Sequence, residues 1–210
     1  MATIIHLIKE YQSKYGIGNT KSPMSIDLAE AREKWLKVPL DLDDWLFRCV
    51  CNRNRHQWCL STKSVNEAVK KLKRKIGVLE KCSDFESLYD IVYDLIGKGN
   101  TGISYSTVYD TSIRLGHSFT PDILPDKYVY VHRHLIHTAN KLLGKGHIEY
   151  NCRILRSIFN KANSDFNLLN SLEIEDFLCV YSEELISSTQ ENSKKPTAEG
   201  LWQKIKSNKY

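Results

Sequence analysis

A glycine-rich turn between two helical patterns constrains this chain more than any other stretch. Three of the eight residues in 97–104 are glycines. Apolar residues recur at three- and four-residue steps over 85–96, and a helical pattern returns over 105–115. Glycine adopts positive φ angles at little cost, so such a run lets the chain reverse between two helices. The sequence therefore predicts a helix, a tight hairpin and a second helix over about 83–116.

The start of each predicted helix carries hydroxyl side chains. Ser83 precedes Glu86 by three residues, which is the spacing of a capping box, so we expect the first helix to begin there. Amide groups in the first turn of a helix have no intrahelical partner, and they lie at the positive end of the helix dipole. We therefore expect the second helix to hold an anion such as DNA phosphate, through Gly99, Gly102, Ile103, Ser104, Ser106 and Thr107.

The hairpin resembles a known DNA-binding motif. Gly102-Ile103-Ser104 is similar to the helix-hairpin-helix motif, whose hairpin is commonly glycine, an aliphatic residue and glycine, before a helix that begins with polar residues. Serine stands here in place of the last glycine, and its hydroxyl can itself donate a hydrogen bond. The resemblance implies a grip on the DNA backbone. A helix C-cap followed by an ordinary tight turn is the alternative interpretation, and it needs no ligand.

A second stretch, 124–133, follows the hairpin by about twenty residues. It resembles the DNA glycosylase superfamily built on helix-hairpin-helix, in which a Pro-x-Asp-like segment at this separation carries an aspartate into the pocket. Asp126 takes that place here, although Pro125 directly precedes it. The residues that follow favour a short strand or extended run before any helix. The resemblance implies that Asp126 is a catalytic carboxylate.

Four further runs are similar to a family of uncharacterised bacterial proteins of about this length. They are Arg55-His56-Gln57, Val108-Tyr109-Asp110-Thr111, Val129-Tyr130-Val131-His132 and the run 174–181. The resemblance carries no known activity. It implies one intact domain, and it marks a set of residues for attention: Arg55, His56, Gln57, Asp110 and His132.

Basic and planar side chains gather in two places outside the hairpin. The segment 51–58 is rich in donors suited to phosphates and base edges, and we expect DNA contacts from Arg53, Arg55, His56 and Gln57. Arg133, beside His132, is a further candidate for DNA binding. The lysine-rich helix expected over 65–76 can line the same groove. The alternatives are an ordinary solvated loop and a solvated helix face.

Composition limits the partners and the class of the protein. The 210 residues are 41% hydrophobic and 26% charged, with a formal charge of +5, which suits a polyanionic partner without requiring one. The six cysteines lack Cys-x-x-Cys spacing, and no apolar run of about eighteen residues occurs. We therefore expect a reduced, cytoplasmic, monomeric protein with no membrane segment and no cofactor. A zinc site at Cys49, Cys51, His56 and Cys59 is disfavoured, because the spacing is too tight and a partner pair is missing.

The remaining pattern is helical, so the predicted fold class is all-α, a multi-helix bundle that contains the hairpin. Helices are expected over 2–15, 25–37, 41–50, 135–143, 150–159 and 172–185, the last of them capped by Ser171. Residues 1–186 are predicted to form one domain. Residues 187–210 are expected to be a linker and a C-terminal tail.

Three functions follow, and the sequence leaves them open. The first is a monofunctional DNA glycosylase that flips a base, normal or modified as in antiphage defence, into a pocket lined by Tyr105, Tyr109, Trp58 and Tyr130. Asp126 or Asp110 would stabilise the cationic sugar, and His132 is the next catalytic candidate. The second is a non-catalytic DNA-binding module. The third is a helical protein-interaction domain whose hairpin is only a turn.

Overall fold

The computed structural model describes residues 3–37, 41–51, 60–99, 102–132, 135–144, 148 and 152–188. Within these ranges the chain forms eleven α-helices, one π-helix, one 3-10 helix and a two-stranded sheet. The predicted all-α class is confirmed. Among the described residues, no helix is both long enough and apolar enough to cross a membrane.

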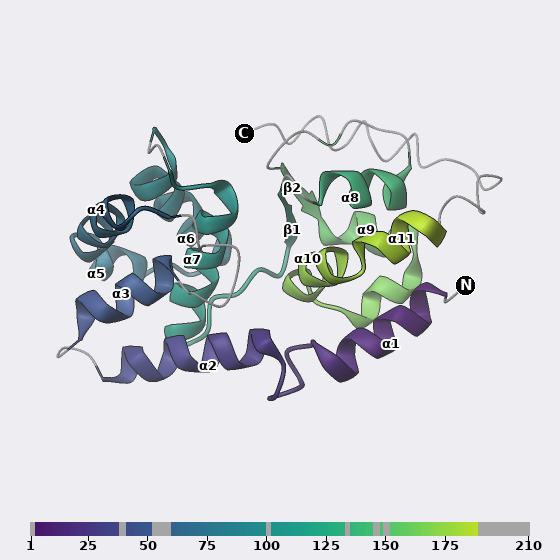
Figure 1. Ribbon diagram of the computed structural model, residues 1–210, viewed down its shortest axis with the longest axis horizontal. Coiled ribbons are helices and arrows are strands. Elements are labelled where there is room, and N and C mark those ends of the chain that lie inside the picture. The colour runs from purple at the N-terminus through teal and green to yellow at the C-terminus, as the bar shows by residue number, and fades with distance from the viewer. Residues whose placement is uncertain are drawn as a thin grey trace. The chain divides into compact units, whose positions relative to one another are not determined.

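The chain divides into two compact units. Unit 1 contains residues 1–22 and 126–210, and unit 2 contains residues 23–125. Unit 1 is therefore assembled from both ends of the chain, while unit 2 is its continuous middle, as the colours of Figure 1 show. No boundary near residue 22 or 125 was expected from the sequence. That residues 1–186 act as one domain stays a prediction.

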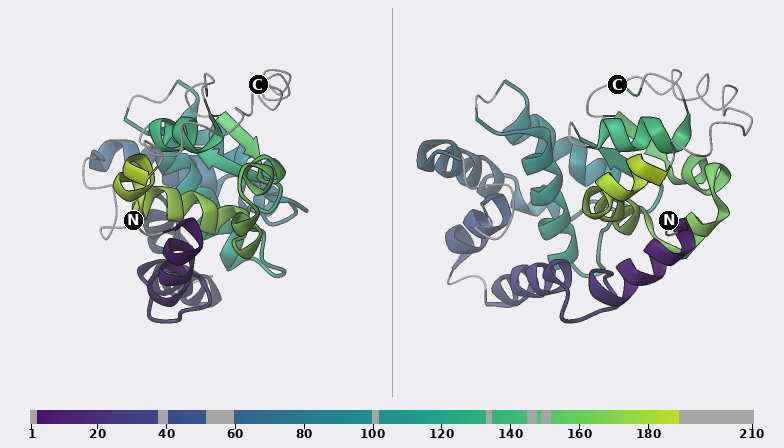
Figure 2. Two further views of the ribbon diagram at one scale, coloured as in Figure 1. Left: turned by 90° about the vertical axis from the view of Figure 1, so that its right-hand side faces the viewer. Right: turned by 45° about the vertical axis from the view of Figure 1, so that its right-hand side comes forward.

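Unit 2 is a helical bundle around its last helix, α7. Its elements are α2 (Pro23–Leu36), α3 (Leu42–Val50), α4 (Thr62–Lys73), α5 (Ile76–Leu79), α6 (Phe85–Val92), the π-helix η1 (Tyr93–Gly97) and α7 (Tyr105–Ser118). Helix α7 packs against α2, α3 and α6, and α4 packs against α3 (Figures 1 and 2). The largest fully buried side chains of this unit are Trp45, Leu46, Leu72, Leu79, Phe85 and Tyr109.

A buried ion pair joins three of these helices. The Arg114 side chain on α7 is 3% exposed, and its Nε donates to Asp27 Oδ2 on α2 at 2.9 Å. Its Nη1 donates to the carbonyl oxygen of Cys49, at the end of α3, also at 2.9 Å. The guanidinium thus satisfies one of the carbonyls that a helix leaves without a partner at its C-terminus. Burial raises the pKa of the Cys49 thiol well above its usual range, so this cysteine is neutral.

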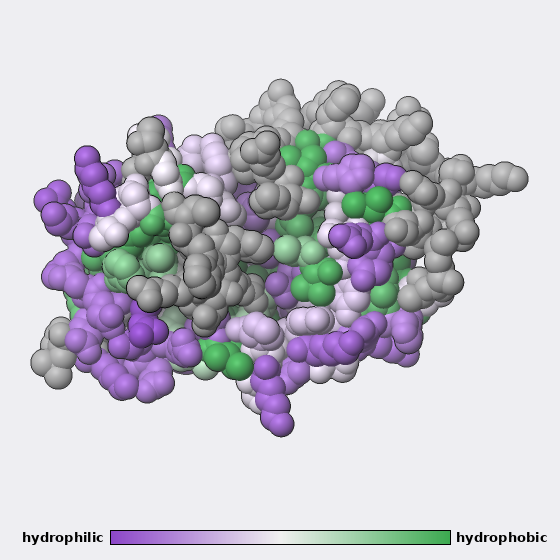
Figure 3. Space-filling model, viewed as in Figure 1, coloured by the Kyte–Doolittle hydropathy of each residue, from purple (hydrophilic) through white to green (hydrophobic). Residues whose placement is uncertain are grey.

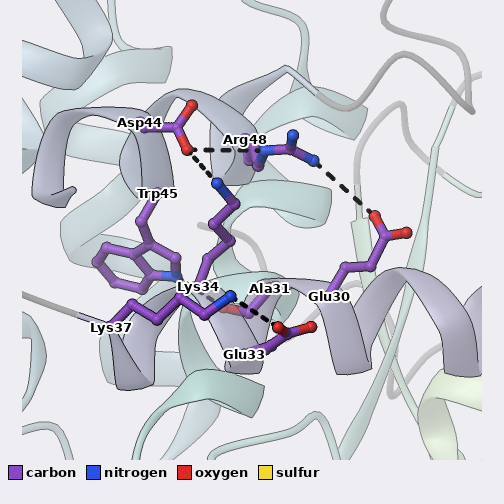
Figure 4. Close-up of polar contacts among 8 residues, drawn as sticks. All are labelled: Glu30, Ala31, Glu33, Lys34, Lys37, Asp44, Trp45 and Arg48. Atoms are coloured by element: carbon purple, nitrogen blue, oxygen red, sulfur yellow. Dashed lines mark hydrogen bonds and ion pairs between the residues drawn. The ribbon is translucent and has the colours of Figure 1, made fainter.

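The contact between α2 and α3 combines a buried indole with surface charges (Figure 4). Trp45 is fully buried, and its Nε1 donates to the Ala31 carbonyl at 3.0 Å. Lys34 Nζ lies 2.5 Å from Asp44 Oδ2 at the more exposed edge. Surface pairs of this kind contribute about 0 to 1 kcal/mol, so burial of Trp45 dominates the contact.

The left-hand edge of the face in Figure 3, which belongs to unit 2, is mainly hydrophilic.

Unit 1 packs helices around a small sheet. Its elements are α1 (Ile4–Lys14), β1 (Tyr128–Val131), α8 (Ile136–Leu143), β2 (Cys152–Leu155), α9 (Arg156–Ala162), the 3-10 helix η2 (Ser164–Leu168), α10 (Ser171–Val180) and α11 (Ser182–Ser188). The strands are antiparallel, with Tyr128 opposite Leu155 and Val131 opposite Cys152. Helix α10 packs against β1, and α11 packs against α8. The short strand predicted after Asp126 is thereby confirmed as β1.

Helix α1 is tied to α10 by polar groups at the edge of this core. The Tyr11 hydroxyl donates to Asp176 Oδ2 at 3.0 Å, and the Tyr11 ring packs edge-to-face on Phe177. Burial raises the pKa of Tyr11 far above its usual range, so the phenol keeps its proton. Glu173 accepts a bond from the Ile17 amide at 3.2 Å. The N-terminal segment is therefore part of the core of unit 1.

Two predicted helix caps were wrong by one residue. Helix α6 is capped by Asp84, whose Oδ1 accepts from the Ser87 amide at 2.8 Å, and Ser83 only bonds to that carboxylate. A carboxylate is favoured there because its charge interacts with the helix dipole. Helix α10 is capped by Asn170, which forms a capping box with Glu173, so Ser171 is the first helical residue.

Two predicted helices in unit 1 were also wrong in extent. The helix expected over 172–185 is divided into α10 and α11 at Tyr181, whose ψ of 26° departs from the helical value. The helix expected over 150–159 begins as strand β2, because residues 152–155 pair with β1. The predicted linker from residue 187 overlaps the end of α11, and residues 189–210 lie outside the described part of the chain.

Gly116 provides a test of this packing. A Cβ at Gly116 would lie 1.9 Å from the Ile123 carbonyl oxygen, and the Ile123 amide donates to the Gly116 carbonyl at 2.9 Å. The Ile123 carbonyl belongs to the backbone and cannot move aside as easily as a side chain can. Gly116→Ala should therefore lower the free energy of unfolding by about 3 kcal/mol. Urea unfolding followed by circular dichroism measures the change.

The matched control for this substitution is Gly77→Ala. A Cβ at Gly77 meets no atom within 4 Å, and the position is helical, so alanine should leave the stability unchanged or raise it slightly. Equal stability of the two variants would contradict the packing described for Gly116.

Candidate nucleic-acid interface

The turn between η1 and α7 is built on two glycines with positive φ. Gly99 has a φ of 67° and Gly102 a φ of 108°, both in the region that favours glycine. A Cβ at Gly99 would meet nothing within 4 Å, whereas a Cβ at Gly102 would lie 2.9 Å from Ser64 Oγ. The positive φ of Gly102 thus favours glycine, and its backbone also lies close to the Ser64 side chain on α4. Ile103 is buried and anchors the turn.

The approach of Gly102 to Ser64 brings the first turn of α4 beside the turn that leads into α7. Ser61 caps α4, and its Oγ accepts from the Ser64 amide at 3.1 Å. Ser104 caps α7 in the same way, and its Oγ accepts from the Thr107 amide at 3.2 Å. The positive ends of two helix dipoles therefore lie near one turn.

Hydroxyl groups and amides line the start of α7. Ser104 Oγ lies 2.8 Å from Ser106 Oγ and 2.9 Å from Thr107 Oγ1. The backbone ladder of α7 begins with the Val108 amide, which donates to the Ser104 carbonyl at 3.0 Å. The Ser106 amide precedes that ladder, so the helix itself supplies no acceptor for it. Hydroxyls and amides of this kind are the groups that hold phosphate oxygens at a helix start.

Three tyrosines form a column beside this turn. The rings of Tyr89 and Tyr93 are parallel within 1° at 6.5 Å, and those of Tyr93 and Tyr105 are stacked at 5.3 Å. The Tyr93 and Tyr105 hydroxyls lie 3.0 Å apart, and this hydrogen bond, followed by burial, raises the pKa of Tyr105. Tyr89 is 6% exposed and Tyr105 is 36% exposed. We call Tyr89, Tyr93 and Tyr105 the tyrosine column.

The predicted catalytic residues belong to both units. Asp110 is a partly buried residue of α7 in unit 2. Asp126 lies in unit 1, before β1, and its side chain is 89% exposed, with Oδ1 at 3.5 Å from Arg156 Nη1. The Asp126 carbonyl accepts a hydrogen bond from the Ser171 hydroxyl. His132 follows β1 and is buried. The structure therefore assigns the predicted hairpin and the predicted carboxylate Asp126 to different units.

The aromatic residues predicted for a base pocket differ sharply in exposure. Tyr109 is 1% exposed and packs edge-to-face on Phe85, with ring centres 5.9 Å apart. Tyr130 is 2% exposed, and the Arg153 guanidinium lies 5.5 Å from its ring centre. Both rings belong to the interior of their units, whereas Tyr105 reaches the surface. The other predicted contacts lie outside the described residues: Arg53, Arg55, His56, Gln57, Trp58 and Arg133.

Part of this site was missed by reasoning from the sequence. Ser61 and Ser64 were not singled out, although a serine three residues before another polar residue is typical of a helix start. Tyr93 was not singled out either, and its stacking on Tyr105 bridges twelve positions. Within the described ranges, no group of three or more histidine, cysteine, aspartate or glutamate side chains is placed to hold a metal ion.

A second polar cluster lies at the other end of α7. His117 Nδ1 is 3.0 Å from Asp122 Oδ2, and Arg32 Nη1 on α2 is 3.1 Å from Asp122 Oδ1. Burial lowers the pKa of His117, and this effect outweighs the opposing influence of the Asp122 carboxylate. The imidazole is therefore neutral at pH 7. The cluster ties the end of α7 to the segment that follows it and to α2.

Comparisons of the chain with protein-family models, with curated proteins and with solved structures give no match.

The lowered pKa of His117 predicts how stability depends on pH. Because the folded state takes up this proton at a lower pH than the unfolded chain, the unfolded state binds more protons just below pH 6.5. The contribution of His117 to the free energy of unfolding is present above pH 6.5 and is lost as the pH falls. His117→Asn, which keeps a nitrogen near the position of Nδ1, should reduce this slope.

Urea unfolding of wild type and His117→Asn at pH 5 to 8 measures the two slopes. Other histidines titrate in both proteins, so the difference between the slopes isolates His117. Identical slopes, or a steeper one in the variant, would contradict the lowered pKa.

Proposed function

We propose that this protein binds DNA, with a backbone phosphate held at the start of α7 in unit 2. The observation that carries the proposal is Gly102, which combines a φ of 108° with a close approach to Ser64. This glycine brings the N-termini of α4 and α7 together at one turn. The resemblance of Gly102-Ile103-Ser104 to a helix-hairpin-helix turn supports the same assignment.

The groups at the turn suit a phosphate. The start of α7, with the Ser106 amide in its first turn, is the positive end of the helix dipole and favours an anion. The Ser106 hydroxyl is hydrogen-bonded to Ser104, so the hydroxyls are held in place before a ligand arrives. A preorganised site loses less entropy when it binds. These contacts read no base sequence, so the proposed binding is a grip on the backbone.

Two lysines flank the turn. Lys63 is exposed in the first turn of α4, and the Lys98 side chain, directly before the turn, is 74% exposed. Lys98 Nζ lies 3.8 Å from Asp94, a surface pair that water weakens. Both ammonium groups can therefore turn to phosphates near the α7 site. Binding through such contacts releases counterions and weakens as salt rises.

Base excision is a second candidate function. It depends on the resemblance of the segment around Asp126 to DNA glycosylases, and the exposure of this carboxylate makes it accessible to a DNA sugar. The same exposure leaves the charge in water, where it stabilises a cationic sugar weakly unless DNA excludes the solvent. Backbone binding is therefore better supported than excision, and it does not depend on Asp126.

The first prediction here concerns salt and Gly102. Affinity for a labelled DNA duplex, measured by fluorescence anisotropy, should fall steeply with salt, by about 0.9 in the logarithmic slope for each phosphate contact. Gly102→Ala should weaken binding about tenfold, because the added methyl strains the backbone and pushes against Ser64. Adding Ser64→Ala removes the nearest atom and should restore part of the affinity.

Gly77→Ala is the control for these variants, because it makes the same change in unit 2 at an open position. Thermal unfolding confirms that each variant is folded before its affinity is compared. A flat salt response, or a folded Gly102→Ala variant with wild-type affinity, would contradict the proposed grip. If the wild-type protein binds no DNA at all, both DNA-binding functions are excluded and the protein-interaction hypothesis remains.

The second prediction tests excision apart from binding. If Asp126 is catalytic, wild type should produce alkali-labile sites in DNA, and Asp126→Asn should abolish them while binding persists. Asp110→Asn is the matched variant, and loss of cleavage there instead assigns the role to Asp110. If neither substitution affects a demonstrated excision, His132 is the next catalytic candidate to test. A wild type that binds DNA without making abasic sites excludes excision and leaves the backbone grip intact.

A further inference from the structure

We propose that one exposed face of α4 extends the DNA-binding surface, so that a bound duplex follows this helix away from the turn before α7. The face carries Lys63, Lys70 and Arg74, and we call these three side chains the basic stripe. The inference rests on the proposed function, because the phosphate held at the start of α7 brings the DNA to the first turn of α4.

The residues of the basic stripe lie on one side of α4, which is labelled in Figure 1. Successive residues of an α-helix turn by about 100°, so residues seven and eleven positions after Lys63 return to within about 20° of its direction. All three residues of the stripe are exposed. The opposite side of α4 carries buried residues, among them Val65, Ala68 and Leu72. The stripe is therefore the face of α4 that points away from the core of unit 2.

The positive charges of the stripe are not neutralised within the described part of the chain. Lys73, to one side of the stripe, pairs with Asp43 at 2.9 Å. Among the residues that the structure describes, no such ion pair involves the stripe itself. Glu67, between Lys63 and Lys70, is the one acidic residue of α4. The face keeps a net positive charge, which suits a polyanion.

The stability of the helix explains only part of this arrangement. Cations are favoured near the C-terminus of a helix, which accounts for Lys70 and Arg74. Lys63 lies in the first turn of α4, where the helix dipole disfavours a cation and where no acidic residue offsets it. The position of Lys63 is therefore better explained by an anionic ligand than by the helix, and the proposed phosphate at the neighbouring turn supplies one.

The length of the stripe matches an extended polyanion. Lys63 and Arg74 are eleven residues apart, which is about 16 Å along the helix axis. A single phosphate cannot reach both of them. B-DNA advances about 3.4 Å per base pair, so the stripe spans about five base pairs of a duplex. A duplex carries its charges in a regular line of that length, and we therefore assign the stripe to the backbone of duplex DNA.

The first test removes two charges from the far end of the stripe. Lys70→Gln/Arg74→Gln should lower the logarithmic salt slope of duplex binding by about 1.8, since each lost phosphate contact removes about 0.9. Lys9→Gln/Lys14→Gln makes the same change in charge at exposed positions of α1 in unit 1, and it should keep the wild-type slope. Thermal unfolding confirms that both variants are folded. A wild-type slope in the folded Lys70→Gln/Arg74→Gln protein would overturn the inference.

The second test looks for a gain of affinity, which damage to the fold would not produce. Glu67→Gln removes the negative charge from this face and should strengthen duplex binding about threefold at low salt, because it ends a repulsion between the carboxylate and the phosphates. Glu184→Gln makes the same change at an exposed position of α11 in unit 1, and it should leave the affinity unchanged. No gain for Glu67→Gln would also count against the stripe.

The outcomes separate this inference from the proposed function. If Gly102→Ala weakens binding while the variants of α4 bind DNA as wild type does, the stripe is overturned and the grip at α7 stands. If the variants of α4 respond as expected while Gly102→Ala keeps the wild-type affinity, the grip at α7 is overturned. If poly-L-glutamate displaces the duplex at an equal concentration of charge, the stripe fits an acidic protein equally well and its assignment to DNA is overturned.

Discussion

The buried guanidinium of Arg114 holds in place the helix that carries the candidate site. Its bonds to Asp27 and to the Cys49 carbonyl bring α2, α3 and α7 to one point inside unit 2. A charge in such a place must be paired, and removing one partner of a buried pair typically costs about 3 to 5 kcal/mol. Helix α7 extends from this pair to its cap at Ser104. The turn before α7 is thus presented on a helix that the core fixes in position and direction.

Each of the three glycines before α7 is explained by a different structural feature. Gly97 leaves room for the Tyr93 ring, Gly99 has a positive φ, and Gly102 has a positive φ and touches Ser64. Packing alone accounts for this much, so the glycines by themselves do not require a ligand. The approach of Gly102 to Ser64 also joins two serine-capped helix starts at one turn. The functional proposal depends on this consequence of Gly102.

The sequence predicts well what depends on neighbouring residues and poorly what depends on distant ones. Helical periodicity located most helices and the all-α class, and two glycines of the predicted turn, Gly99 and Gly102, have the positive φ expected of them. Arg114 and Asp27 are 87 positions apart, and no local pattern links them. The sequence does not distinguish an aromatic residue that lines a pocket from one that packs in a core. The buried positions of Tyr109 and Tyr130 were therefore found only from the three-dimensional structure. The cap of α6 at Asp84 was missed because Ser83, one residue earlier, stands three residues before Glu86, the spacing of a capping box.

The most direct test of the central claim is to map the amides that DNA touches. In an NMR titration with a short oligonucleotide, the largest backbone amide shifts should fall on Tyr105, Ser106 and the first turn of α4. The reason is that a bound phosphate polarises the N–H groups that donate to it. Small shifts there, with the largest ones in unit 1 or at the far end of α7 near His117, would contradict the claim that the start of α7 holds the DNA backbone.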